Sequence, residues 1–462
     1  MRAAPLAGGP QGADALRPLI DVVLRALRDG AVERGGPLPR GGPERVGREV
    51  REAVGVAVPE HGTGAEEALR TVVRAVAAGA ADPAEALCAA HLHTPPLAVA
   101  AAADLAASAL NPSMDSWDQA PAASELEALV AAALAAEVFP GEAHPDALVT
   151  TGGTESNLLA LLLARERHGA VRVVVGADAH HSFHRAAWLL GLPEPVVVPA
   201  PNGTIDPVAL DEALRATPGP LLVAATAGTT DAGLIDPLPE IADLCAAHGD
   251  ADLHVDAAYG GPALFSAAHR PLLAGLDRAR TVTMDLHKLG WQPAAAGLLA
   301  VRDAADLAVL THTADYLNAD DDTDAGLPDL LGRSLRTTRR PDVLKTAVTL
   351  RALGRDGLGG LVDACMELAA HLADLVEKAP GLELYARPTL TTVLFRPYDA
   401  SDEAVAGIRR TLLTEGRAVL GRAAADGRLW LKATLLNPHA TPGDLRNILT
   451  LVNTLVEGGS DR

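Results

Sequence analysis

Short apolar runs alternate with longer amphipathic stretches between Ala122 and Leu350 of this 462-residue chain. The runs are rich in valine, leucine and alanine, and the stretches between them are long enough to form helices. This alternation is typical of a mainly parallel sheet covered by helices, because a parallel connection must cross back over the sheet between strands. The pattern predicts an α/β fold with strands at 171–175, 195–198, 221–225, 253–255 and 281–284.

The two ends of the chain follow different patterns. Residues 1–60 contain two helical stretches that are separated and flanked by glycine and proline. This pattern indicates an arm that packs on another surface. After Val343 the pattern predicts one long helix, then strands at 391–395 and 429–432 and a final helix from Pro442. We therefore expect three domains, namely an N-terminal helical arm (1–84), a large α/β domain (85–342) and a small α+β domain (343–462).

Composition and charge narrow the class of protein. No run of about 18 uncharged apolar residues is flanked like a membrane span, and the N-terminus lacks a signal-peptide pattern, so we expect a cytoplasmic protein without membrane attachment. The formal net charge of −20 disfavours binding to nucleic acid or to anionic lipid. The cysteines are scattered through helix-like segments at Cys88, Cys245 and Cys365, which argues against disulfides and against a cysteine-ligated metal.

Lys288 is one of only four lysines in the chain, and it follows His287 at the end of an apolar run that begins at Arg280. A lysine amine becomes a nucleophile when burial or a neighbouring cation lowers its pKa, and it can then form an imine with an aldehyde cofactor. The alternative is a surface lysine whose side chain extends from a strand end into solvent. The other motifs of the chain must decide between a Schiff-base lysine and this alternative.

A glycine-rich turn, Thr150-Thr-Gly-Gly-Thr-Glu-Ser-Asn157, follows a short apolar run and opens a predicted helix at Leu158. Glycines let the backbone approach an anion closely, and the hydroxyls of Thr154 and Ser156 add hydrogen-bond donors. The N-terminus of the helix contributes unpaired N–H groups and the positive end of its dipole. The turn therefore predicts a phosphate site, although a Thr/Ser capping box preceded by glycine would give a similar pattern.

Asp256 ends the predicted strand 253–255 and is followed by Ala257 and Ala258. A carboxylate at the carboxyl end of a parallel strand points into the crevice where ligands bind. It could keep a pyridine nitrogen protonated, and the small Ala258 would let a flat ring lie against the sheet. The alternative is an aspartate that only caps the next turn.

His180 opens a helix after the strand 171–175, where its ring could stack on a flat cofactor. A metal site is the competing interpretation, because His180 and His184 have i, i+4 spacing and His91 and His93 form a second close pair. No carboxylate-bearing helix motif accompanies either pair, so we expect no metal.

The order of these motifs, with Thr226-Ala-Gly-Thr-Thr230 between them, resembles that of the group II decarboxylases, which have fold type I and depend on pyridoxal 5′-phosphate (PLP). The resemblance covers about residues 85–455. It implies a mainly parallel seven-stranded sheet and an N-terminal arm that serves dimerisation. It also implies that Lys288 carries the cofactor as a Schiff base, that Asp256 pairs with the pyridinium nitrogen, and that His180 and Ala258 lie on opposite faces of the ring. The remaining contacts that it implies are Gly153, Thr154 and His287 to the phosphate, and Thr226 and Thr230 near the ring substituents and the substrate carboxylate.

Within this family, the chain is similar to L-2,4-diaminobutyrate decarboxylases and to lysine decarboxylases of siderophore pathways. The similar stretches are His91–Pro96, Asn111–Gln119, Ala314–Asn318 and Ser334–Asp342. The similarity implies an amino acid substrate and a homodimer with shared active sites. The residues that we expect near the substrate are His93, Asp115, Trp117, Asp118 and Tyr316.

The activity that the resemblance implies is decarboxylation of an L-amino acid to its amine, with a diamino acid such as L-2,4-diaminobutyrate as the expected substrate. Two rival functions stay open. One is a related PLP enzyme that decarboxylates another amino acid or a natural-product intermediate, with or without oxidative deamination, and the other is an inactive homologue that acts as a binding subunit. The chain departs from its relatives at Pro341, where phenylalanine is usual, and at Lys432, where arginine is usual. The donor of the proton to Cα stays unassigned.

Overall fold

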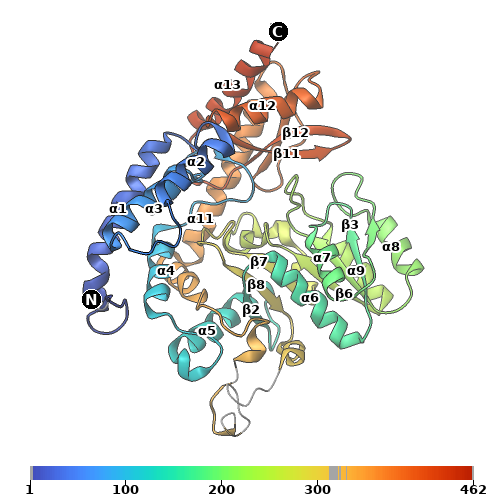
Figure 1. Cartoon of the computed structure of the whole chain (residues 1–462). Coiled ribbons are helices and arrows are strands. Elements are labelled where there is room, and N and C mark those ends of the chain that lie inside the picture. The colour runs from blue at the N-terminus through green and yellow to red at the C-terminus, as the bar shows by residue number, and fades with distance from the viewer. Residues whose placement is uncertain (1–3, 312–320, 322–323, 329, 460–462) are drawn as a thin grey trace. The chain divides into compact units, whose positions relative to one another are not determined.

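The computed structural model describes residues 4–311, 321, 324–328 and 330–459, and Figure 1 shows the order of the elements along the chain. Contacts within the chain group the residues into two compact units. The large unit consists of Pro96–Met366 and Pro388–Leu390, and the small unit consists of Met1–Pro95, Glu367–Arg387 and Thr391–Arg462. The domain boundaries expected after residues 84 and 342 stay a prediction.

A seven-stranded sheet forms the centre of the large unit (Figure 1). Five neighbouring strands pair in parallel, whereas the strand next to one edge runs antiparallel to both of its neighbours. The sheet confirms the predicted α/β fold. In spatial order its strands are β2 (Asp146–Thr150), β8 (Gly297–Val301), β7 (Thr281–Asp285), β6 (Ala251–Asp256), β5 (Leu221–Thr226), β3 (Arg172–Gly176) and β4 (Val196–Val198).

The three central parallel strands end at one edge of this sheet. Thr226 at the end of β5 is in register with Asp256 at the end of β6, which is in register with Thr283 of β7. Every residue of β5 and β7 is buried, as expected for parallel strands covered on both faces. Polar side chains that follow these strands therefore lie together at the carboxyl ends of the strands, although they are far apart in the sequence.

Helix α6 (Gly153–His168) connects the glycine-rich turn to the core of the sheet. Its Leu161 lies in an apolar cluster with β3 and α7, and its Leu159 and Leu163 lie in a second cluster with β2 and β8. Full burial of a leucine stabilises a fold by roughly 1.5–3 kcal/mol, so three of them hold the start of this helix firmly on the sheet. Among the described residues, the other α-helices confined to the large unit are α4 (Ala98–Leu110), α5 (Pro121–Val138), α7 (Ser182–Leu189), α8 (Pro207–Ala216) and α9 (Leu238–His248).

Helix α11 (Val343–Lys378) contributes residues to both units. Gly354 interrupts it with a φ of 64°, a left-handed conformation that glycine adopts at little cost. The predicted long helix after Val343 is confirmed. Short 3₁₀ turns elsewhere in the large unit are η1 (Trp117–Gln119), η2 (Gly261–Phe265), η3 (Arg270–Leu273), η4 (Leu276–Arg278), η5 (Ala304–Leu310) and η6 (Leu331–Arg333).

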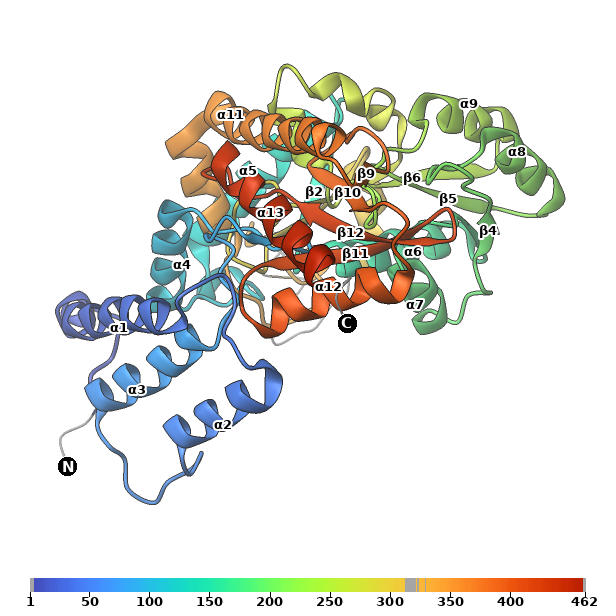
Figure 2. The same ribbon diagram turned by 90° about the horizontal axis from the view of Figure 1, so that it is seen from above.

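The small unit combines a five-stranded sheet with helices from both ends of the chain. Figure 2 shows α12 (Asp402–Thr414) and α13 (Pro442–Gly459) against this sheet, and their apolar residues share one core with it. The strands expected at 391–395 and 429–432 and the final helix are confirmed as β10, β12 and α13. In spatial order the strands are β1 (Cys88–Ala89), β11 (Val419–Ala425), β12 (Arg428–Thr434), β10 (Thr392–Pro397) and β9 (Leu382–Leu384), and the N-terminal helices are α1 (Gly12–Arg34), α2 (Gly42–Val54) and α3 (Ala65–Ala78). Among the described residues, no helix is both long and apolar enough to span a membrane.

Candidate active site

Lys288 follows β7 and lies beside the aspartate that ends this strand. Its Nζ is 3.0 Å from Oδ2 of Asp285, and 19% of the lysine side chain is exposed. The aspartate side chain is only 2% exposed. The amine is therefore held by a buried carboxylate while staying accessible to a small molecule, which argues against a lysine that merely extends into solvent.

The glycine-rich turn lies directly against the ring of His287. Gly152 has a φ of 146°, and a Cβ at this position would lie 2.9 Å from Cε1 of His287. A Cβ on Gly153 would lie 3.1 Å from the Cβ of Ala258. Both distances are shorter than ordinary carbon contacts, so a larger residue would displace its neighbours. The turn, His287 and Ala258 thus come together from three separate segments of the chain.

The start of α6 offers N–H groups to an anion. The first intrahelical bond runs from the Ser156 N–H to the Gly152 carbonyl (3.0 Å), so the N–H groups of Gly153, Thr154 and Glu155 have no acceptor within the helix. Glu155 accepts hydrogen bonds from the N–H (2.6 Å) and the hydroxyl (2.7 Å) of Thr151, which lies one residue before the N-cap Gly152. A reciprocal Thr/Ser capping box is therefore not formed at this helix start, and the N–H groups of Gly153, Thr154 and Glu155 stay available for an anion.

Asp256 is almost fully buried at the end of β6, with 5% of the residue exposed. Its Oδ1 accepts a hydrogen bond from the Ala258 N–H (3.1 Å), and its Oδ2 accepts one from Nδ2 of Asn157 (2.8 Å). The first contact is the turn cap that the sequence left open as an alternative. The second orients the carboxylate through a residue of α6.

Asn157 is the centre of a buried hydrogen-bond network. Besides Asp256, its Nδ2 donates to Oγ of Ser182 (2.9 Å), and its Oδ1 accepts from Oγ1 of Thr283 (2.8 Å). The same Oδ1 lies 3.1 Å from Nε2 of His254. Burial lowers the pKa of His254 to about 4, so its ring is neutral near pH 7 and can donate one hydrogen bond through Nε2.

His180 is joined to this network through Ser182, whose Oγ lies 2.9 Å from Nδ1 of the histidine. Burial lowers the pKa of His180, and the nearby carboxylate of Asp256 opposes that shift. The ring is therefore neutral near pH 7 and is fixed in orientation by a polar contact at one nitrogen. The partner of His180 in the alternative metal pair, His184, instead lies 2.5 Å from Oε1 of Glu194.

The two threonines of the Thr226-Ala-Gly-Thr-Thr230 motif differ in exposure. Thr226 is buried beside Asp256, and its N–H donates to Oδ2 of Asp236 (2.7 Å). Burial raises the pKa of Asp236 to about 6. Thr230 is exposed beyond the end of β5.

The segment Asn111–Gln119 is anchored at its centre. The Met114 N–H donates to the Arg339 carbonyl (3.0 Å), and the Arg339 guanidinium makes a two-pronged ion pair with the buried Glu127 (2.5 and 2.7 Å). Asp115 is buried and accepts a hydrogen bond from Gln119 (2.8 Å). The chain therefore builds this segment as an ordered structure.

The other residues expected near the substrate are less enclosed. Asp118 is exposed and accepts a hydrogen bond from Ser116 (2.6 Å), and Trp117 is 39% exposed. Within the described residues, no hydrogen bond or ion pair joins this segment to Asp256, His287 or Lys288. His93 is exposed in the small unit, and Tyr316 lies outside the described residues.

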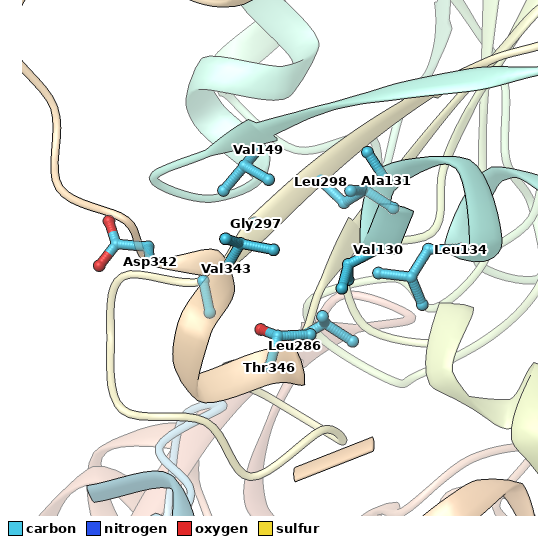
Figure 3. A pocket seen from close by; sticks show the side chains of 11 residues that line it. Val130, Ala131, Leu134, Val149, Leu286, Gly297, Leu298, Asp342, Val343 and Thr346 are labelled. Carbon is cyan, nitrogen blue, oxygen red and sulfur yellow. The ribbon is translucent and has the colours of Figure 1, made fainter. Parts of the chain in front are cut away.

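A small apolar cavity is lined by Leu286, the residue before His287 in the sequence (Figure 3). Its volume is about 10 Å³, which is room for a single water molecule. Its walls are mainly aliphatic, so it is too small and too apolar to hold an amino acid. The lining residues are Val130, Ala131, Leu134, Val149, Leu286, Ala296, Gly297, Leu298, Asp342, Val343 and Thr346.

The described residues fit PLP at each functional part of that molecule. The glycine turn and the helix start suit a phosphate, the buried Asp256 suits a protonated ring nitrogen, and Lys288 suits an aldehyde. Oδ1 of Asp285 is buried without a partner in the described part of the chain, and this orphaned acceptor faces the same turn. Fold and site together define an enzyme of fold type I that uses PLP.

The comparisons with known proteins agree on the family. A family model described as the pyridoxal-dependent decarboxylase conserved domain matches residues 48–398. The chain is 42% identical over 412 residues to an L-2,4-diaminobutyrate decarboxylase of Rhizobium meliloti (strain 1021), covering 86% of this chain and 83% of that protein. It is 31% identical to one from Acinetobacter baumannii, covering 88% and 86% respectively. The chain belongs to the pyridoxal-dependent decarboxylases.

Solved structures extend this result to the whole chain. The glutamate decarboxylase domain of a diaminobutyrate–pyruvate transaminase and L-2,4-diaminobutyrate decarboxylase from Vibrio parahaemolyticus has a TM-score of 0.86 and 30% identity, and the match covers 98% of this chain and 97% of that one. Mouse CSAD has a TM-score of 0.85 and 25% identity, with 97% and 99% covered. The protein is therefore a PLP-dependent amino acid decarboxylase with fold type I, as the sequence predicts.

Sequence reasoning did not identify two residues of this site. The sequence shows Asn157 only as the last residue of the glycine-rich motif. It shows Asp285 only as part of the strand before Lys288, and it predicts no role for either side chain. Both residues could have been found from the sequence, because polar side chains are unusual at buried positions. Asn157 is an amide one turn inside a helix, and Asp285 is a carboxylate three residues before a reactive lysine.

Proposed function

We propose that this enzyme decarboxylates L-2,4-diaminobutyrate, releasing carbon dioxide and taking up one proton to give 1,3-diaminopropane. The observation that carries the proposal is the 42% identity to the Rhizobium meliloti enzyme over 86% of this chain. The competing specificity is an acidic amino acid, since the acidic amino acid decarboxylases of mouse and human are each 30% identical over 77% and 75% of this chain.

In the proposed site, Lys288 would anchor the cofactor at its aldehyde carbon, and Asp256 would keep the ring nitrogen protonated. Bound PLP supplies an electron sink for the pair that is left on Cα when carbon dioxide departs. The buried carboxylate of Asp256 strengthens that sink, because a carboxylate shielded from water favours the protonated form of the nitrogen beside it. Gly153, Thr154 and His287 hold the phosphate.

His180 and Ala258 are proposed to lie on opposite faces of the cofactor ring. His180 is neutral near pH 7 because burial lowers its pKa, so it can stack without placing a second cation beside the pyridinium. Thr226 and Thr230 are assigned to the ring substituents and the substrate carboxylate. Their assignment is supported by the position of Thr226, which is in register with Asp256 at the same sheet edge.

We assign recognition of the distal ammonium to Asp115 or Asp118, with His93, Trp117 and Tyr316 lining the substrate side. The support is the ordered Asn111–Gln119 segment, which carries two carboxylates. A homodimer with shared active sites is part of the proposal, and members of this family are typically dimeric. In such a dimer the carboxylates of one subunit can serve the site of the other.

An amino acid panel tests this assignment. The PLP-loaded enzyme is incubated with 2,4-diaminobutyrate, ornithine, lysine, aspartate, glutamate and cysteine sulfinate, and both carbon dioxide and the identified amine are measured. We expect kcat/KM for 2,4-diaminobutyrate to exceed that for every acidic substrate by at least about 100-fold, because a mispaired charge costs roughly 3 kcal/mol. Preferred turnover of an acidic or neutral amino acid would overturn the substrate, and an aldehyde with peroxide would overturn simple decarboxylation.

The carboxylates are tested in the same assay. Asp118→Asn and Asp115→Asn should each be compared with Asp243→Asn, which removes an aspartate that is 73% exposed on α9. Whichever of Asp115 and Asp118 binds the distal ammonium of the substrate, its replacement by asparagine should raise KM for 2,4-diaminobutyrate by about 10-fold or more. The effect of that replacement on kcat should be smaller. Unchanged KM in both variants would contradict this part of the proposal.

A further inference from the structure

Asp285 is a buried carboxylate, and within the described residues only one of its oxygens has partners. Its Oδ2 lies 3.0 Å from Nζ of Lys288 and 3.6 Å from Nε2 of His287. Its Oδ1 is buried and makes no hydrogen bond within the described part of the chain. A buried acceptor left unpaired costs on the order of 1–3 kcal/mol, and more when it is charged. Oδ1 therefore needs a donor that these residues do not supply.

The carboxylate lies against the glycine-rich turn. A Cβ built on Gly152 would lie 3.6 Å from Oδ1 of Asp285, and one built on Gly153 would lie 3.4 Å from Oδ2. The same turn opens α6, whose first N–H groups are assigned to the cofactor phosphate. Asp285 thus lies beside the turn at which the proposed phosphate site begins.

A carboxylate and a phosphate dianion repel each other strongly in a buried site, where charges are poorly screened. A phosphate that keeps one proton lessens this repulsion and also brings the O–H donor that Oδ1 lacks. Phosphate esters lose their second proton with a pKa of about 6, so the site must raise this phosphate pKa above about 9 for the proton to be retained at pH 8 to pH 9.

We propose that Asp285 makes this site bind the cofactor phosphate as a monoanion, with the phosphate O–H donating a hydrogen bond to Oδ1 of the aspartate. The inference rests on the proposed phosphate role of Gly153 and Thr154. Asp285 acts as a binding residue that sets the charge of the phosphate, and the proton is taken up from solution together with the cofactor. No covalent bond changes in this step.

Titratable groups face Asp285 and its partners from several elements. The ring of His287 is engaged through Nδ1, which lies 3.1 Å from the carbonyl oxygen and 3.2 Å from the N–H nitrogen of Ala296, so Nε2 is the atom nearest the aspartate. A proton held on this imidazole in place of the phosphate is the competing arrangement. The groups are Lys288 and His287 on the same segment, Asp256 on β6, His180 before α7, and Glu155, which is paired with Arg336, on α6.

Phosphorus-31 NMR of the purified holoenzyme at pH 8 reports the charge of the phosphate directly. We expect the bound cofactor of the wild type to resonate at the position of a phosphate monoanion. In Asp285→Asn it should move to the position of a dianion, because the amide can itself donate to the phosphate. Asp252→Asn, at the opposite end of β6, removes a carboxylate far along the strand and should keep the wild-type resonance. A wild-type resonance at the dianion position overturns the proposal.

Binding of 4′-deoxypyridoxine 5′-phosphate to the cofactor-free enzyme gives an independent measure, because this analogue lacks the aldehyde and cannot bond to Lys288. Uptake of one proton predicts a Kd that rises about tenfold per pH unit between pH ~7 and pH ~9 in the wild type. The rise should be far shallower in Asp285→Asn.

The possible failures are distinguishable. A wild-type Kd that does not change with pH overturns the role of Asp285 and leaves the cofactor site in place. Absence of any binding overturns the proposed cofactor site itself. If Asp285→Asn does not fold, the wild-type resonance and the wild-type pH dependence still decide the question.

Discussion

Nδ2 of Asn157 lies 2.8 Å from Oδ2 of Asp256, although the two residues are 99 positions apart in the chain. Asn157 belongs to α6, the helix whose first residues Gly153 and Thr154 are assigned to the phosphate. One helix therefore positions both the phosphate end and the ring-nitrogen end of the proposed cofactor site. The distance between those two ends is set by the rigid rise of an α-helix rather than by a flexible loop.

Substitution of Asn157 should weaken both cofactor binding and the fold. Asn157→Asp replaces a donor with a second carboxylate facing Asp256, and the repulsion should raise the Kd for PLP by about 10-fold or more and shift the visible absorption of the bound cofactor. Asn157→Ala leaves buried partners unpaired and should lower the free energy of unfolding by about 1–3 kcal/mol. Cofactor titration and urea unfolding measure the two effects. An unchanged Kd and spectrum in both variants would show that the network is only structural.

The sequence predicts the individual motifs of this site better than the connections between them. Lys288, Asp256 and the glycine-rich turn are recognisable because each combines an unusual residue with the end of an apolar run. The contact of Asn157 with Asp256 depends on how α6 packs on the sheet, and no local pattern encodes that register. The sequence does not indicate a role for Asp285, because it lies in a mainly apolar strand. A single carboxylate there does not change the pattern that predicts the strand.

Gly152→Ala should impair cofactor binding specifically. The new Cβ would lie 2.9 Å from Cε1 of His287, so the ring or the turn must shift. We expect the Kd for PLP to rise by about 10-fold or more, because phosphate hydrogen bonds are sensitive to displacements of this size. Gly141→Ala is the matched control, since Gly141 also has a left-handed φ (89°) but a Cβ there meets nothing within 4 Å. Equal affinity losses in the two variants would point to backbone strain rather than to the site.

His254 should make stability fall on mild acidification. Burial lowers its pKa from 6.5 to about 4 in the folded protein. Below about pH 6.5 the unfolded chain binds a proton at this histidine while the folded protein does not. The free energy of unfolding therefore decreases as the pH drops toward 4, by a total on the order of 3 kcal/mol. Urea unfolding at pH 7 and pH 4.5 should show a smaller loss in His254→Gln than in the wild type. The same loss in both proteins would contradict a neutral buried ring.

The ion pair between Arg339 and Glu127 should matter for stability, because the two side chains are only 1% and 5% exposed. Arg339→Met leaves a buried carboxylate without its partner and should lower the free energy of unfolding by about 3–5 kcal/mol. The double variant with Glu127→Gln should recover a substantial part of that loss. Arg45→Met breaks an exposed pair with Glu49 and should leave the free energy of unfolding nearly unchanged. Similar losses for both arginines would contradict the role of burial.

The fold was predictable where a strand is a short, mainly apolar run that is buried on both faces. The runs at 221–225 and 281–284 correspond to β5 and β7, which are buried on both faces and therefore stand out from the helices around them. The edge strand β2 and the antiparallel β8 were not predicted individually. Strand β8 (Gly297–Val301) carries too short a pattern to distinguish it from a buried helix segment, and its position between β2 and β7 depends on tertiary pairing.

The central claim is that Lys288 is the attachment point of the cofactor. Lys378→Ala provides the matched control, because Lys378 is exposed at the end of α11. Lys378→Ala removes an exposed side chain, whereas Lys288→Ala leaves the buried Asp285 without its cation, so urea unfolding of both variants accompanies the absorption measurement. Only Lys288→Ala should lose the visible absorption band of the bound cofactor, with a loss of decarboxylation by several orders of magnitude.

The most direct test is reduction of the purified holoenzyme with borohydride, followed by peptide mapping by mass spectrometry. Reduction converts a Schiff base into a stable secondary amine and so marks the lysine that carried it. We predict a phosphopyridoxyl adduct on Lys288 in the wild type and in Lys378→Ala, and no adduct in Lys288→Ala. An adduct on Lys345, Lys378 or Lys432 in the wild type, or a modified lysine in Lys288→Ala that retains the visible band, would contradict the account.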